Sequence, residues 1–105
     1  MGYSAQTKQK DLIMSGVALQ VGGYKNITAT GNVAPIAVKM LGIFVASASS
    51  TPTIAVYDSA TTTTTDPVVA TFTPSAGTFY TIPAATEAGL YVVIGGTVNC
   101  TVFFA

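Results

Sequence analysis

From residue 17 onward, apolar and polar residues alternate in short runs, and clusters of Gly, Pro, Ser and Thr separate these runs. The clearest run lies near the C-terminal end, where Val98, Cys100, Val102 and Phe104 alternate mostly with Asn and Thr. A period of two places alternate side chains on opposite faces of a strand. The pattern therefore predicts a series of half-buried β-strands.

The alternating runs define seven or eight predicted strands. They cover residues 17–21, 24–30, 37–46, 53–58, 67–73, 78–82, 89–94 and 97–104. Residues 47–52 predict a turn, and Gly95-Gly96 predicts a two-residue hairpin turn. Because the connections are too short for helical crossovers, the strands should pair antiparallel. We expect an all-β fold over residues 17–105, an antiparallel β-sandwich of the jelly-roll or Ig-like type.

One predicted strand, residues 37–46, is apolar on both faces. One face carries Leu41, Ile43 and Val45, and the other carries Met40, Gly42 and Phe44. Such a strand belongs at the centre of a sheet, or it has one face in a contact with another chain.

Residues 1–16 differ from the rest and are expected to form an N-terminal arm. Three charged residues lie between positions 8 and 11, and the apolar group Leu12, Ile13 and Met14 follows. We interpret this apolar group as a candidate contact with a partner chain. The alternative is a frayed terminus.

The composition excludes several kinds of chemistry. The chain has no His and no Trp, its positive charges are all Lys, 8% of its residues are charged, and its formal net charge is zero. Without His, a Ser-His-Asp triad is excluded and a zinc site is disfavoured. A chain without a basic patch is not suited to nucleic acid, and it has no apolar stretch of the ~20 residues that a membrane span needs. We expect no enzymatic activity, no cofactor and no metal.

The remaining reactive groups have structural explanations. Cys100 lies in the middle of a predicted strand and is expected to be a small core residue. Asp58 and Asp66 flank a threonine-rich loop, where they are expected to cap turns. The alternative is a weak calcium site formed with threonine or backbone oxygens.

Aromatic residues are the best candidates for a contact surface. Tyr24, Tyr57, Tyr91 and Phe103 lie on or near the strand faces opposite the predicted core. Exposed aromatic rings can pack against protein or stack on sugars. The alternative is that a different strand register buries some of them.

Four segments resemble small virion proteins of tailed bacteriophages, namely residues 24–27, 41–49, 51–58 and 89–102. Similar small β-proteins serve as capsid decoration or cement proteins. The resemblance implies a protein made in the bacterial host cytoplasm that binds the capsid exterior. It also implies a homotrimer that bridges subunits of the major capsid protein. It brings no active-site residues.

A second class of function is also compatible with the sequence. Exposed aromatic residues on a small β-domain could form a carbohydrate-binding or adhesion module of a phage fibre or head appendage. Such a module needs a concave site with an aromatic platform, whereas a cement protein needs broad apolar patches.

Overall fold

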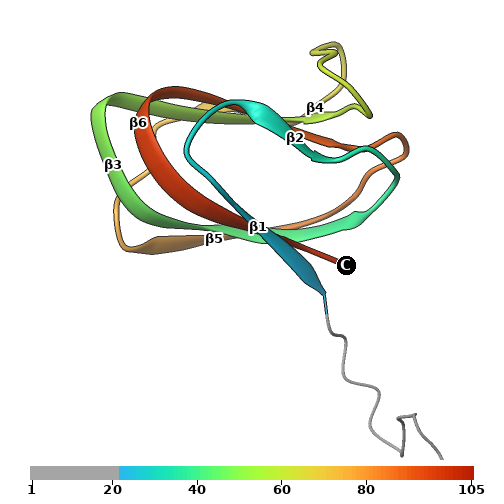
Figure 1. The fold of residues 1–105 in the computed structure, drawn as a ribbon, viewed down its shortest axis with the longest axis horizontal. Coiled ribbons are helices and arrows are strands. Elements are labelled where there is room, and N and C mark those ends of the chain that lie inside the picture. The colour runs from blue at the N-terminus through green and yellow to red at the C-terminus, as the bar shows by residue number, and fades with distance from the viewer. Residues whose placement is uncertain (1–21) are drawn as a thin grey trace, which may run out of the picture.

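The computed structural model describes residues 22–105, which form six β-strands and no helix (Figure 1). The strands are β1 (Gly23–Ile27), β2 (Gly31–Ala34), β3 (Lys39–Asp58), β4 (Pro67–Phe72), β5 (Thr78–Ala85) and β6 (Leu90–Phe104). All of them belong to one sheet, and every pair is antiparallel. The predicted all-β antiparallel fold is confirmed, while the predicted arm and the strand over residues 17–21 lie outside the described residues.

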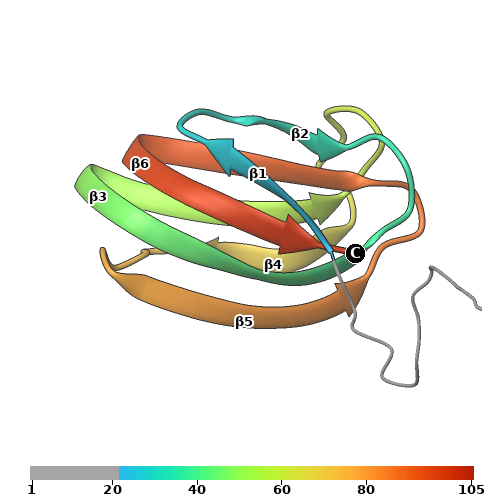
Figure 2. The ribbon, with the colours of Figure 1, turned by 60° about the horizontal axis from the view of Figure 1, so that its bottom comes forward.

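The two long strands β3 and β6 form the spine of the sheet. They pair from Met40↔Phe104 at one end of the ladder to Asp58↔Leu90 at the other. The shorter strands flank the two halves of this ladder: β1 and β5 flank one half, and β2 and β4 flank the other (Figure 2). One half therefore has the order β1-β6-β3-β5, and the other has the order β2-β6-β3-β4.

The two long strands bend together where the sequence predicted turns. Ser50 and Thr51 in β3 have positive φ angles of 58° and 54°, and Gly96 in β6 has a φ of 69°. The register shifts here, but pairing resumes on both sides, from Ser49↔Thr97 to Thr53↔Gly95. The hairpin predicted at Gly95-Gly96 is therefore wrong. Four predicted strands merge into β3 and β6, and β2 (Gly31–Ala34) was not predicted, so residues 22–105 have six strands.

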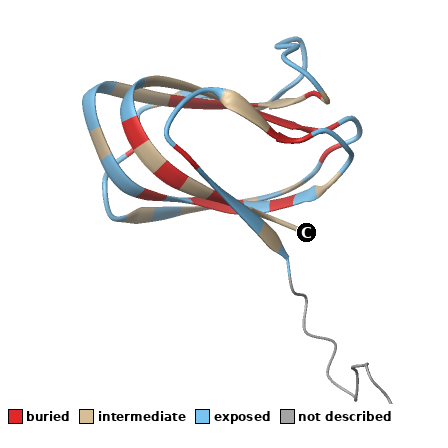
Figure 3. Cartoon of the chain, in the orientation of Figure 1, coloured by how far each residue is buried: buried red, intermediate tan, exposed pale blue. Residues whose placement is uncertain are grey.

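The bend turns the two halves of the sheet toward each other, and the core lies between them (Figures 1 and 3). The β1-β6-β3-β5 half contributes Met40, Ile43, Val45, Val98, Cys100 and Val102 to a single buried cluster. The other half contributes Val33, Ala34, Ile54, Val56, Leu90 and Val92 to the same cluster. The inward positions predicted for Val92 and Cys100 are confirmed, since neither side chain is exposed.

A register shift changes the faces predicted for the start of β3. The shift lies between Met40 and Gly42 and affects the pairing of β3 with both β5 and β6. Met40 consequently joins Ile43 in the core, and Leu41 and Phe44 lie on the outer face. The prediction that Leu41 shares a face with Ile43 is therefore wrong, because an irregular ladder breaks the period of two. The central position predicted for this strand is confirmed.

Candidate functional site

The outer side of the β1-β6-β3-β5 half carries a group of large apolar side chains, which we name the aromatic face. It consists of Tyr24, Leu41, Phe44, Phe79 and Phe103. Cross-strand pairing brings these residues together, because Tyr24 lies opposite Phe103, and Phe44 lies opposite Phe79. Their neighbours along the strands, such as Ile43 and Val102, point into the core on the other side of the sheet.

Gly42 gives the Phe79 ring its place on this face. A Cβ atom at Gly42 would lie 2.6 Å from Cζ of Phe79 and 2.5 Å from the carbonyl oxygen of Tyr80. The ring therefore occupies space that a side chain on β3 would fill. Its centroid lies 6.0 Å from that of Phe103, at an interplanar angle of 60°. This is the tilted, edge-to-face kind of aromatic pair.

The aromatic face is unusually exposed for its composition. Tyr24 is 73% exposed, Phe79 48%, Phe44 39% and Leu41 38%. These are four of the five large hydrophobic side chains that are exposed in residues 22–105, the fifth being Ile36. Scattered apolar residues are normal on a protein surface, but a contiguous group of this kind marks an interaction site.

The polar groups beside the aromatic face are engaged within the chain. The Asn26 amide donates hydrogen bonds to Oδ1 of Asn99 at 2.9 Å and to the carbonyl oxygen of Cys100 at 3.0 Å. It also lies 3.1 Å from the hydroxyl of Thr101. These contacts hold β1 against β6 and occupy the only side-chain amide on β1.

Charged groups gather at one end of the molecule, away from the bend. Residues 22–105 contain five charged side chains. Two of them, Lys39 and Asp58, are the first and last residues of β3 (Figure 1). Asp66 and Glu87 lie in the loops that precede β4 and follow β5. We call this the charged end. The fifth, Lys25 on β1, donates from its ammonium to the carbonyl oxygen of Asn32 on β2 at 3.3 Å. No charged side chain belongs to the aromatic face.

Asp58 organises the charged end as a turn cap. Its carboxylate accepts hydrogen bonds from the backbone N–H groups of Glu87 and Ala88, both at 2.8 Å, and of Gly89 at 3.2 Å. These donors, chiefly Glu87 and Ala88, hold the pKa of Asp58 below its ordinary value. The capping role predicted for Asp58 is confirmed. Among residues 22–105 no three acidic or Cys side chains are grouped to hold a metal ion.

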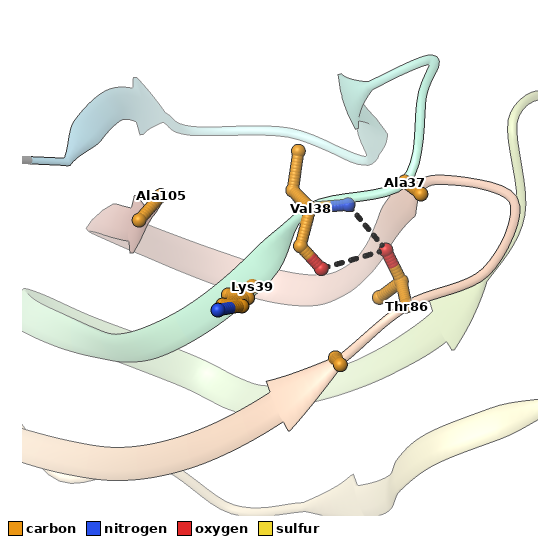
Figure 4. A pocket seen from close by; sticks show the side chains of 6 residues that line it. Ala37, Val38, Lys39, Thr86 and Ala105 are labelled. Carbon is orange, nitrogen blue, oxygen red and sulfur yellow. Dashed lines mark hydrogen bonds between the residues drawn. The ribbon is translucent and has the colours of Figure 1, made fainter.

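A shallow hollow at the charged end offers little chemistry. It is lined by Ala37, Val38, Lys39, Ala85, Thr86 and Ala105 (Figure 4). The Thr86 hydroxyl accepts a hydrogen bond from the Val38 N–H at 2.9 Å and donates one to the Val38 carbonyl at 3.1 Å. Both hydrogen-bonding functions of this hydroxyl are thus used to join the start of β3 to the segment after β5. Lys39 is the one charged residue among those that line the hollow.

The structure divides the aromatic residues that the sequence singled out. Tyr24 and Phe103 lie together on the aromatic face. Tyr57 and Tyr91 instead pair with each other in the β2-β6-β3-β4 half, with ring centroids 6.3 Å apart. Tyr91 is only 8% exposed and does not belong to an exposed surface. It lies between β2 and β3 in the sheet, opposite Asn32 and Tyr57.

The other predicted contact residues are the apolar group of the arm, Leu12, Ile13 and Met14, which lie outside the described residues. Sequence reasoning did not select Phe44 and Phe79, which complete the aromatic face. The sequence did indicate that residues 37–46 are apolar on both faces, which is compatible with a contact on one side of that strand. No pattern in the sequence shows that the Phe79 ring crosses over Gly42.

The described part of the chain contains no helix long and apolar enough to cross a membrane. Comparison of the chain with protein-family models found no match, and comparisons with curated proteins and with solved structures found none either. The aromatic face is therefore interpreted from its own chemistry.

Proposed function

We propose that this chain is a structural protein of a tailed-bacteriophage virion, of the capsid decoration or cement type. In this role it binds the capsid exterior and stabilises contacts between subunits of the major capsid protein. The observation that carries the proposal is the exposed, uncharged aromatic face. The resemblance of residues 41–49, 51–58 and 89–102 to such virion proteins supplies the identity of the partner.

The chemistry of the aromatic face suits a protein partner. Aromatic residues are enriched, and charged residues depleted, at the centres of protein interfaces. Phe44, Phe79 and Phe103 offer apolar surface whose burial is favourable at about 25 cal/mol per Å². Because the five side chains of the face are uncharged, burying them removes no charge from water.

The proposal includes a finer description of the architecture. We infer that the bent sheet is a two-layer antiparallel sandwich, with the aromatic face on the outside of the β1-β6-β3-β5 layer. The single core cluster shared by both halves supports this inference. With that layer against the shell, the partner would contact a face held rigid by the central ladder of β3 and β6.

A carbohydrate-binding or adhesion module is the alternative, and Tyr24 favours it as an exposed ring near two side-chain amides. Three features favour protein instead. Phe44, Phe79 and Phe103 have no polar group to orient a sugar. The Asn26 amide already donates within the chain. The Phe79 and Phe103 rings are inclined at 60° and do not form a flat platform.

The test is the binding of purified protein to capsids that have lost their native decoration protein. Phe44→Thr removes a ring from the centre of the face and keeps a residue that strands accept. We expect it to weaken capsid binding about tenfold or more, as the loss of an aromatic anchor does. Ile36→Thr is the matched control, since Ile36 is 66% exposed and does not belong to the face.

Both variants should keep the wild-type thermal transition, which shows that the fold is intact. If Phe44→Thr binds capsids as wild type does, attachment does not use the aromatic face. Binding of the wild type to isolated glycans, with none to capsids, would select the adhesion alternative.

A further inference from the structure

The free edge of β5 carries no charged residue, and Pro83 is the one residue of the strand without a backbone N–H. Within residues 22–105, β5 pairs with β3 alone, so the backbone groups along its other edge have no strand partner. Its eight residues include no charged side chain, and neither does any residue from 67 to 86. Proteins that stay monomeric commonly protect such an edge with Lys or another charged residue. Protection by charge is missing here, and residues 78–82, which precede Pro83, remain free to pair along this edge.

Of the four edge strands, β5 is the best suited to pairing with another strand. β1 carries Lys25, and β2 has only four residues. β4 begins with Pro67, and its pairing with β3 is irregular at two places. β5 is the longest of the four, and Thr78 to Thr81 pair without interruption against Val45 to Gly42.

Apolar groups lie on both sides of this edge. On the outer side, the Phe79 ring is 48% exposed. On the inner side, a hollow between β4 and β5 is lined by Val69, Phe72, Tyr80, Thr81 and Ile82. The Tyr80 ring contacts Phe72 there, with centroids 5.1 Å apart, and its hydroxyl accepts a hydrogen bond from the Ser75 N–H. A strand added to β5 would cover both apolar groups at once.

We propose that the added strand is β5 of a second copy of this chain, paired antiparallel about a two-fold axis at Tyr80. This register places Phe79 opposite Thr81 of the second copy and Thr78 opposite its Ile82. Aromatic and β-branched residues opposite one another stabilise a sheet. No charge faces another charge. A symmetric pair of β1 strands centred on Lys25 would instead set two lysines opposite each other.

The pairing has a geometric consequence for the aromatic face. A two-fold axis perpendicular to the sheet leaves the outer faces of both copies on the same side. The two aromatic faces then form one continuous surface that extends across both chains. The inference concerns the protein alone in solution, so it does not depend on the proposed capsid role. It differs from the trimer that the resemblance implies.

The test is the mass of the full-length protein by sedimentation equilibrium over a range of concentrations. The expected result is an association to twice the chain mass of 10.7 kDa. Thr81→Lys places a charge on the free edge of β5 and should raise the dimer dissociation constant about tenfold or more. Thr71→Lys, at an exposed position on the β4 edge, is the matched control and should leave the constant unchanged.

A second measurement keeps the test decisive if a lysine disturbs the fold. An equimolar mixture of Thr81→Lys and Thr81→Glu proteins should recover the dimer mass, because opposite charges then lie near each other across the axis. A wild-type monomer at hundreds of micromolar, a trimer mass, or equal effects of the two lysine variants would each overturn the inference. A monomer that still binds capsids would leave the proposed function standing.

Discussion

Two glycines allow other groups to approach more closely than any side chain would permit. At Gly42, the absent side chain leaves room for the Phe79 ring on the aromatic face. At Gly96, a Cβ atom would lie 2.4 Å from the carbonyl oxygen of Ser50, across the bend of the sheet. Gly96 also has a φ of 69°, which other residues rarely adopt. One glycine thus shapes the proposed contact surface, and the other shapes the bend that closes the core.

The Asp58 cap should make folding stability sensitive to acid. Its folded-state pKa lies below the unfolded value, so the unfolded chain binds a proton at higher pH than the folded chain does. The stabilisation is present above the unfolded pKa of about 4 and is lost as pH falls through the folded pKa. Asp58→Asn should therefore reduce the difference between denaturant midpoints measured at about pH 7 and at about pH 3. Asp66→Asn is the control, because it also removes one carboxylate charge but leaves the three hydrogen bonds to Asp58 in place. An unchanged difference in Asp58→Asn would contradict the role of the cap.

A core substitution checks the predicted faces of β6. Val92 is fully buried, and Val93 is only half-buried on the other face. Val92→Ala should lower the free energy of unfolding by roughly 1–3 kcal/mol, because it removes buried methyl groups and leaves a cavity. Val93→Ala should cost less. The measurement is urea denaturation of each variant, and equal losses would show that the two side chains are packed alike.

At the scale of elements, the alternation in sequence predicted the strands well and their connections less well. The inward positions along β6 followed from the period of two: Leu90 and Val92 are fully buried before the bend, and burial alternates from Val98 to Val102 after it. The bend itself was predicted as turns, because Gly, Ser and Thr are common both in turns and, as at Ser50, Thr51 and Gly96, at irregular positions with positive φ inside a strand. Whether such residues reverse a chain or bend it depends on the partner strand. The pairing of residues 49–53 with 95–97 is a long-range contact that no local pattern contains.

The composition of the aromatic face was predictable only in part, for the same reason. Tyr24 and Phe103 were found because each breaks a polar face of its own strand. Leu41 was grouped with Ile43 on one face, and the irregularity in the ladder between Met40 and Gly42 places them on opposite faces. Tyr91 was expected at the surface, and its position in the middle of a four-stranded half explains its burial.

Substituting a glycine at the bend can show how much of the cost comes from backbone conformation and how much from close contact with the facing strand. Gly96 and Gly77 have similar φ angles of 69° and 73°, but no atom lies within 4 Å of a Cβ placed at Gly77. Gly96→Ala should destabilise the fold by roughly 1–3 kcal/mol more than Gly77→Ala, because only Gly96 meets the backbone of the facing strand. Urea midpoints of the two variants give the comparison. Equal losses would show that the close approach to Ser50 carries no cost.

At the scale of the whole molecule, charge and apolar surface are separated. Four of the five charged side chains in residues 22–105 lie at the charged end, while β5 and the aromatic face have none. Like charges on a surface keep proteins apart in solution. A molecule that has so few charges, and keeps them at one end, leaves its remaining surface suited to contact with other chains. The proposed capsid contact and the proposed β5 pair are neighbouring parts of that uncharged surface and share Phe79.

The pairing of Gly23 with Phe104 also determines how the fold resists a pulling force. These residues form the outermost pair of the β1–β6 ladder, and the chain leaves both strands at this end (Figure 2). A load applied between them would open the ladder one residue pair at a time, as a zipper opens, and would not shear all five pairs together. Single-molecule stretching between these two points should therefore meet little resistance at first. Under such a load, β1 would separate before the central ladder of β3 and β6.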